Sequence, residues 1–364
     1  MALNCGIVGL PNVGKSTIFN AMTAAGAESA NYPFCTIDPN VGIVALNDPR
    51  LLTLQKAFGS KRMVPATVEF VDIAGLVAGA SKGEGLGNQF LGHIRETDAI
   101  LHVVRCFEDT QVIHVEGSVD PTRDIATIDL ELILADMDSL TRRKSRVEKK
   151  ARSGEKDAKA DLAATEKVLA LLEAGEPARK ADLTDDERAI LKDAHLITLK
   201  PVLFVANVAE DMLGKPNPLV EQVERIAKEQ GAQVVAISGA IESELATLDA
   251  ADRQDYLADL GVEEAGLDRL AHAAYALLGR ITYFTAGPQE ARAWTVRKGT
   301  LAPAAAAEIH SDIERGFIRA EVAAFEDVAA IGPWQPLKDA GKVRLEGKDY
   351  VVQDGDVIYF RFNV

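Results

Sequence analysis

The sequence predicts an α/β fold in which buried strands alternate with helices. Short apolar runs recur between segments with helical periodicity, and the first of them leads directly into a glycine-rich turn and a helix. Such runs are typical of a mostly parallel sheet that helices cover on both faces. The predicted strands are Cys5–Val8, Gly42–Leu46, Thr67–Val71, Ile100–Val104, Val202–Ala206 and Gln233–Ile237.

The composition is that of a globular protein. Of the 364 residues, 47% are hydrophobic and 26% are charged, and this length favours about two or three domains. The net charge of −15 argues against a protein that coats nucleic acid, DNA included, so any contact with a polyanion must come from a local basic patch. Three scattered cysteines and the lack of a leader or long apolar run predict a cytoplasmic protein without membrane contact. Nothing demands more than a monomer.

The segment Gly9–Thr17 fits the phosphate-binding pattern G-x-x-x-x-G-K-[S/T] and follows a buried strand. Its glycines let backbone N–H groups turn toward phosphate oxygens. We expect the Lys15 ammonium to reach the β- and γ-phosphates and the Ser16 hydroxyl to ligate Mg²⁺. A helix predicted over Lys15–Ala24 directs its positive N-terminal end at the same anion.

A second motif, D-x-x-G, follows the strand that ends near Val71. Asp72 is predicted to hold a water molecule on Mg²⁺, and the Gly75 N–H to sense the γ-phosphate. Between the two motifs, Thr36 is a candidate for a second magnesium-directed hydroxyl, with a plain surface threonine as the alternative. The glycine-rich segment after Gly75 is expected to change conformation when the γ-phosphate is lost.

The residue after Gly75 is Leu76, which cannot orient an attacking water as a glutamine does. We therefore expect slow hydrolysis, or another group that orients the water. The Asn12 side-chain oxygen could ligate a monovalent cation such as K⁺, which would stabilise charge in the transition state. His114 is a candidate for orienting the water, with a structural histidine as the alternative.

Base recognition is expected after the strand Val202–Ala206. Guanine-specific P-loop proteins carry Asn-Lys-x-Asp there, whereas this chain has Asn207-Val208-Ala209-Glu210. Glu210 is one methylene too long for the guanine contact, and Val208 replaces the lysine. A site built for paired polar contacts binds a base much more weakly when those contacts are misplaced, so specificity for guanine should be lost or much weakened. Ser238-Gly239-Ala240 occupies the position of the usual base loop and lacks its lysine.

Almost a hundred residues with a different character separate Val104 from Pro201. Apolar positions at helical spacing predict two helices, one beginning near Asp124 and one carrying Leu162 and Leu172, with Ser153-Gly154 between them. These two helices are predicted to form an antiparallel hairpin that packs as a short coiled coil. Its tip carries nine positive and three negative side chains, which suits a phosphate backbone, although a solvated helix face is the alternative. The basic residues are Arg142, Arg143, Lys144, Arg146, Lys149, Lys150, Arg152, Lys156 and Lys159.

From about Gln289 the sequence predicts a small mixed α/β unit. We expect Trp294–Arg297 to be extended and a single helix to cover Ala304–Glu314. Asp354-Gly355 should form a tight turn between the last two strands. The predicted strands after the helix are Arg319–Phe325, Lys348–Val352 and Val357–Phe362.

Together these motifs resemble the YchF family of Obg-like ATPases. The matching stretches are Gly6–Thr17, Pro33–Thr36, Val71–Leu76, Gly79–Gln89 and Val351–Val364. The resemblance implies a Ras-like P-loop NTPase domain over residues 1–280, interrupted by a helical hairpin over 120–200. It also implies a C-terminal α+β TGS domain over 281–364, a ubiquitin-like β-grasp module. Members bind and hydrolyse ATP in preference to GTP and associate with ribosomes.

Several site residues are implied by the resemblance. The phosphate loop falls on Asn12, Val13, Gly14, Lys15, Ser16 and Thr17, and the magnesium ligands fall on Ser16 and Thr36. Base contacts fall on Asn207 and Val208, with Ser238 in the variable base loop. His114 matches a position proposed to assist hydrolysis.

Three functions compete. The leading hypothesis is a Mg²⁺-dependent ATPase that binds the ribosome through the basic hairpin tip and the TGS domain, and acts as a nucleotide switch in translation or stress regulation. A conventional ribosome-assembly GTPase is the first alternative, which the Asn207–Glu210 segment disfavours. The second is a scaffold for ribosome or RNA in which the nucleotide is structural, a reading that Leu76 keeps open.

Overall fold

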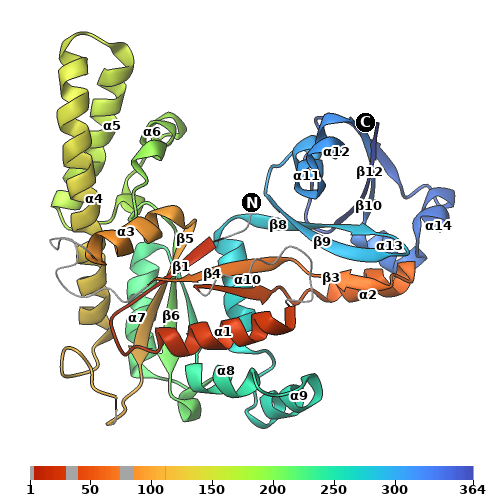
Figure 1. The fold of residues 1–364 in the computed structure, drawn as a ribbon, viewed down its shortest axis with the longest axis horizontal. Helices are drawn as coiled ribbons and strands as arrows, with labels where there is room; N and C mark the ends of the chain where they lie inside the picture. Colours follow the sequence, from red (N-terminus) through yellow and green to blue (C-terminus); the bar gives the residue numbers. More distant parts are fainter. Residues whose placement is uncertain (1–3, 30–39, 74–85, 111, 364) are drawn as a thin grey trace.

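The computed structural model describes residues 4–29, 40–73, 86–110 and 112–363. Thr36, Gly75 and Leu76 lie outside the described residues. The described chain forms two sheets with their helices and a long helical hairpin that projects from the first sheet (Figure 1).

The first sheet contains the six predicted strands, which are confirmed with ends that shift by a residue or two. Its order is β2-β4-β1-β5-β6-β7, in which β2 runs antiparallel to β4 and the other neighbours are parallel. Every residue of β5 and β6 is buried, which explains their continuous apolar runs. The strands are β1 (Asn4–Val8), β2 (Val41–Ala45), β4 (Thr67–Asp72), β5 (Ala99–Cys106), β6 (Val202–Val208) and β7 (Gln233–Ile237).

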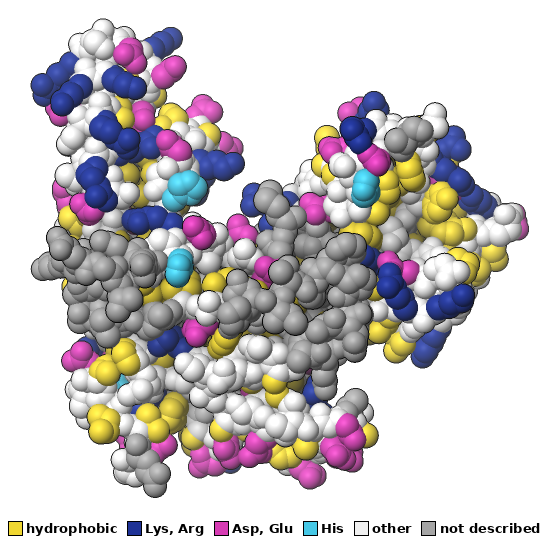
Figure 2. All heavy atoms as spheres, viewed as in Figure 1, with side chains coloured by type: hydrophobic (Ala, Val, Ile, Leu, Met, Phe, Trp, Pro, Cys, Tyr) yellow, Lys and Arg dark blue, Asp and Glu magenta, His cyan; other side chains and the backbone are white. Residues whose placement is uncertain are grey.

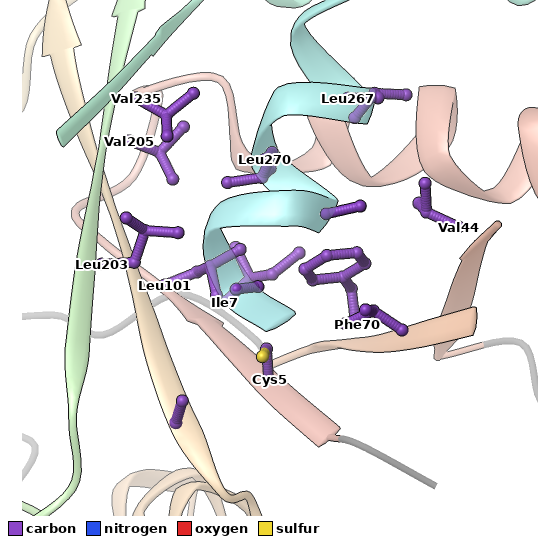
Figure 3. Packing of buried hydrophobic residues seen from close by; sticks show 14 of the residues in the cluster. Cys5, Ile7, Val44, Phe70, Leu101, Leu203, Val205, Val235, Leu267 and Leu270 are labelled. Carbon is purple, nitrogen blue, oxygen red and sulfur yellow. The ribbon is translucent and has the colours of Figure 1, made fainter. Parts of the chain in front are cut away.

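Helices cover both faces of this sheet. On one face, Leu267 and Leu270 of α10 (Gly266–Leu277) pack against strand residues that include Ile7 and Phe70 (Figure 3). The helix after the glycine loop, α1 (Lys15–Ser29), begins as predicted and ends five residues later than Ala24. On the other face lie α4 (Pro121–Arg152) and α7 (Pro218–Gln230), which are joined by a Gln230–Asp129 hydrogen bond. The remaining helices of this part are α3 (Leu86–Glu96), α8 (Gly239–Leu245) and α9 (Ala250–Asp259).

The predicted helical hairpin is present. It consists of α4 and α5 (Lys156–Glu173), which turn at Ser153-Gly154 and bury a shared apolar core that includes Leu140 and Val168. The short helix α6 (Asp185–Leu191) packs against α5. The fully buried Asp136 anchors the hairpin base, because its carboxylate accepts from the backbone N–H groups of residues 197 and 198 at 2.9 and 2.7 Å.

The second sheet has the order β11-β10-β12-β8-β9-β3. Two details of its prediction are wrong. The helix expected over Ala304–Glu314 is split at His310, which is extended and accepts through its ring from the Asp312 N–H. Residues 348–352 form no strand, and only Val351 makes an isolated bridge, to Leu301. The elements are β8 (Arg280–Ala286), β9 (Glu290–Arg297), α11 (Ala302–Ile309), α12 (Ser311–Arg315), β10 (Phe317–Ala324), α13 (Phe325–Ile331), α14 (Trp334–Asp339), β11 (Arg344–Glu346) and β12 (Asp356–Phe362).

The N-terminal half of the chain supplies the last strand of this second sheet. β3 (Arg62–Val64) follows α2 (Pro49–Phe58) and pairs in parallel with β9. Arg50 of α2 bonds to Asp354 at 2.7 Å and lies over the Phe284 ring. These contacts fasten the two sheets together. Among the described residues, no helix is both long and apolar enough to cross a membrane.

Candidate nucleotide-binding site

The glycine turn after β1 has backbone geometry that its sequence requires. Gly14 has a φ of 94°, and a Cβ there would lie 2.1 Å from Asn207 Nδ2. Asn12 also lies in the left-handed region, with a φ of 61°. Asparagine tolerates this conformation better than most residues, whereas a side chain at residue 14 would meet both strain and a clash. The turn therefore depends on glycine at position 14.

Lys15 opens α1 and is held inside the turn. Its side chain is buried, and its Nζ donates to the Leu10 carbonyl at 2.7 Å. Burial lowers the pKa of Lys15 to about 8, and the charge of Asp72 opposes that shift. Burial conversely raises the pKa of Asp72, which Lys15 opposes. The ammonium and the carboxylate are thus close enough to influence each other across the turn.

The residues proposed as magnesium ligands can be compared with the donors that the ion prefers. Ser16 is exposed in the first turn of α1, and Asp72 ends β4. A hydroxyl and a carboxylate are the hard oxygen donors that suit Mg²⁺, which commonly uses few protein ligands beside substrate phosphates. The described residues hold no cluster of three or more His, Cys, Asp or Glu that would bind a metal by itself. The donor set therefore fits a metal bound together with a phosphate.

Asn207 joins the phosphate turn to the loop after β7. It is buried near the end of β6, where its Nδ2 donates to the Val13 carbonyl at 2.9 Å and its Oδ1 accepts from the Gly239 N–H at 3.0 Å. Neighbouring Ser238 is 1% exposed, and its hydroxyl has no hydrogen-bond partner among the described residues. Buried hydroxyls are normally bonded, so this one is expected to bond a ligand or a water.

Gly14, Asn207 and Ser238 line one open pocket of about 720 Å³, a volume within the range of ordinary ligand sites. Phosphate-turn residues form one end and the segments after β6 and β7 form the other. The segment after β5 forms a further wall that the sequence did not predict. The lining residues are Gly14, Thr17, Phe107, Glu108, Asp109, Thr110, Val112, Asn207, Val208, Ala209, Glu210, Asp211, Ser238, Gly239 and Ala240.

His114 lies in the loop before α4, beside the phosphate turn. The adjacent Ile113 carbonyl accepts from Asn12 Nδ2 at 3.1 Å. The His114 ring is buried, with Nε2 2.8 Å from Asp124 Oδ2 and Nδ1 accepting from the Glu116 N–H at 3.1 Å. Both ring nitrogens are engaged, so orienting a water would require the ring to leave one of these partners.

Arg105 is a residue of this site that the sequence did not predict. It is 1% exposed near the end of β5, and its guanidinium contacts both the phosphate turn and the wall after β5. The signal in the sequence was an arginine within a strand that is apolar apart from His102.

Comparisons with known proteins identify the family of this chain. Residues 280–363 match the YchF-GTPase C-terminal family model, described as a protein of unknown function, and residues 4–132 match a model described as a 50S ribosome-binding GTPase. The ribosome-binding ATPase YchF of Bacillus subtilis is 56% identical over 366 residues and that of Escherichia coli O157:H7 54% over 364, with 100% of both chains covered in each case.

A solved structure gives the same result for the fold. The YchF GTPase of Schizosaccharomyces pombe has a TM-score of 0.90 at 38% identity, covering 99% of this chain and 97% of that one. This match confirms the predicted fold class along the whole chain. The chain therefore belongs to the YchF family of P-loop nucleoside triphosphatases.

Proposed function

We propose that this chain is a ribosome-associated ATPase of the cytoplasm that binds and hydrolyses ATP with Mg²⁺, in preference to GTP, and acts as a nucleotide-dependent switch. Residues 1–280 would form the nucleotide unit, and the hairpin (120–200) and C-terminal unit (281–364) would carry partner contacts. The observation that carries this proposal is the pocket, which links the phosphate turn to a buried Ser238 hydroxyl without a partner among the described residues.

The preference for adenine rests on the base side of this pocket. Val208 is buried where guanine-specific proteins have lysine, and Glu210 replaces their aspartate. The bacterial relatives are named ATPases and the S. pombe protein a GTPase, so the base must be measured. Calorimetric titration should give a lower Kd for ATP than for GTP. Equal or tighter binding of GTP would refute the adenine preference and favour the GTPase alternative.

The Ser238 hydroxyl offers a sharper test of where the base lies. Ser238→Ala should weaken ATP binding several-fold, because a buried hydroxyl that bonds a ligand is lost. Ser60→Ala is the matched control, since Ser60 is also buried but donates to the Gly287 carbonyl outside the pocket. An unchanged Kd in Ser238→Ala would place the base elsewhere.

We propose that Mg²⁺ is bound by the hydroxyls of Ser16 and Thr36 and by Asp72, which would hold a water molecule on the ion. When bound, the ion would neutralise charge on the β- and γ-phosphate oxygens. Lys15 would contribute its ammonium to the same oxygens, and its buried position keeps the charge next to them. ATP titrations with and without Mg²⁺ should differ strongly in wild type and much less in Ser16→Ala.

Hydrolysis and its cation dependence are tested together. The proposed K⁺ site uses Asn12 Oδ1, because Nδ2 already donates to Ile113. Phosphate release should be faster in K⁺ than in Na⁺, and an equal rate would remove Asn12 from this role. Steady-state release should disappear in Lys15→Ala, and its persistence would favour the scaffold alternative.

For ribosome binding, we propose the exposed basic residues of the hairpin tip (Figure 2). The predicted patch must be corrected, because Arg143 is buried and pairs with Asp161 and Asp193. Arg142, Lys144 and Arg152 also have acidic partners. The patch is therefore Arg146, Lys149, Lys150, Lys156 and Lys159.

Charge reversal tests this patch. Glutamate at Arg146, Lys149 and Lys150 together should weaken co-sedimentation with ribosomes and flatten its salt dependence. Reversing the exposed Arg225 and Lys228 of α7 is the matched control and should leave sedimentation unchanged. Unaltered sedimentation of the tip variant would mean that the patch is only solvated.

A further inference from the structure

Arg105 is a buried cation with an unusual set of partners. Its three guanidinium nitrogens donate to backbone carbonyls, Nε to Phe107 at 3.1 Å, Nη1 to Asn12 at 3.4 Å and Nη2 to Asp109 at 3.4 Å. The guanidinium carbon also lies 4.5 Å from the centre of the Phe107 ring. In the described part of the chain, no carboxylate lies within ion-pair distance of it.

A buried charge is costly unless it is well bonded, and an apolar residue would suit the interior of β5 better. The surrounding strand is otherwise apolar apart from His102. Stability of β5 therefore does not explain an arginine at this position. Its hydrogen bonds suggest a different role, because they join segments rather than complete the strand.

The three carbonyls belong to two segments that meet at the nucleotide pocket. Asn12 lies in the phosphate turn, in the left-handed conformation, whereas Phe107 and Asp109 line the wall after β5. The same two segments are joined again where Asn12 Nδ2 donates to the Ile113 carbonyl at 3.1 Å. The strained residue of the phosphate turn is thus held by both its carbonyl and its side chain.

We propose that Arg105 is a positioning residue that fixes the phosphate turn against the pocket wall after β5. The site for the nucleotide is then preorganised, because the two segments are held in place before the nucleotide binds. The inference rests on the nucleotide-binding function proposed above. Arginine is needed because its planar fork presents donors in several directions and stays charged, whereas lysine presents a single point charge.

Lysine at this position separates geometry from charge. Arg105→Lys keeps the cation but cannot span three carbonyls on two segments. We expect its KM for ATP to rise at least tenfold while kcat changes less than threefold, because the loss falls on preorganisation. Arg105→Gln, which removes the charge as well, should raise KM at least as much.

Arg143→Lys is the matched control. Arg143 is also buried and also donates from all three guanidinium nitrogens, to Asp161, Asp193 and the Ile190 carbonyl, but in the hairpin. A purely structural role for Arg105 would make the two lysine variants alike, each lowering the melting temperature without changing KM. Rates are measured well below the melting temperature of each variant.

The outcomes are separable. Arg105→Lys or Arg105→Gln that folds and keeps the wild-type KM overturns this inference and leaves the proposed function standing. A raised KM in Arg143→Lys as well would also overturn it, because the effect would then be general destabilisation. Absence of ATP binding by wild type would instead refute the proposed function.

Discussion

Asn207 allows a direct test of how the pocket is built. Both polar ends of its amide are used within the protein, on the Val13 carbonyl and the Gly239 N–H. We therefore expect Asn207 to brace the phosphate turn against the base loop rather than to choose between bases. Asn207→Ala removes both bonds and leaves the two backbone groups buried without that partner.

The magnitude follows from the number of groups affected. A hydrogen bond contributes about 1 kcal/mol net, and a buried group left unpaired costs about 1–3 kcal/mol. Two such groups predict a loss of about 2–6 kcal/mol in the free energy of unfolding. If about 1.4–2.8 kcal/mol of this is felt by the bound nucleotide, Kd rises about ten- to a hundredfold. ATP and GTP should lose affinity to the same extent.

Calorimetry with both nucleotides and urea unfolding measure these quantities. Asn217→Ala is the control, because Asn217 is equally buried and also makes two bonds, to the Cys106 carbonyl and the Leu219 N–H, but does not line the pocket. It should lose stability with an unchanged Kd. A change of more than threefold in the ATP-to-GTP ratio for Asn207→Ala would refute the brace, since Asn207 would then read the base.

Three further predictions concern the turn and the hairpin. Gly14→Ala should abolish ATP binding in calorimetry because of its clash with Asn207, whereas Gly59→Ala, at a φ of 62° with nothing within 4 Å of the added Cβ, should cost only about 1 kcal/mol of stability. ATP affinity should be constant below about pH 8 and then fall up to about tenfold per unit, because phosphate binds the protonated Lys15 whose pKa is lowered to about 8; Lys15→Ala should remove this slope. Asp136→Ala should lower the free energy of unfolding by about 3–5 kcal/mol in urea titrations, because three donors lose their acceptor, and binding of ATP with an unchanged Kd would confirm that the effect is confined to the hairpin base.

The first sheet could be predicted because its strands are apolar runs, of which the central β5 and β6 are buried at every residue. The C-terminal unit was harder for local reasons. An alanine-rich segment favours one continuous helix. The backbone at His310 is instead extended, and the His310 ring caps the next helix by accepting from the Asp312 N–H. β3 has only three residues, too few to show alternation, and its partner Glu290 lies 228 positions away from Arg62. Pairing over that distance leaves no pattern in the sequence.

The site shows the same division. The phosphate turn and Asn207 could be predicted because the carboxyl ends of parallel strands meet at one edge of a sheet. Arg105 could not, because its role depends on three backbone carbonyls, which any residue supplies. The partner of His114 was also missed, since Asp124 lies in the first turn of a helix that the sequence placed only approximately.

The long helix α4 connects the nucleotide-binding domain directly to the tip of the hairpin. Its 32 residues run without interruption from Pro121, next to the His114 loop, to the basic end of the hairpin, a span of roughly 48 Å. A tilt of only about 5° at the foot would sweep the far end through about 4 Å over that span. A partner bound at the distal end of the hairpin could therefore tilt α4 and displace its first turn, where Asp124 bonds to His114.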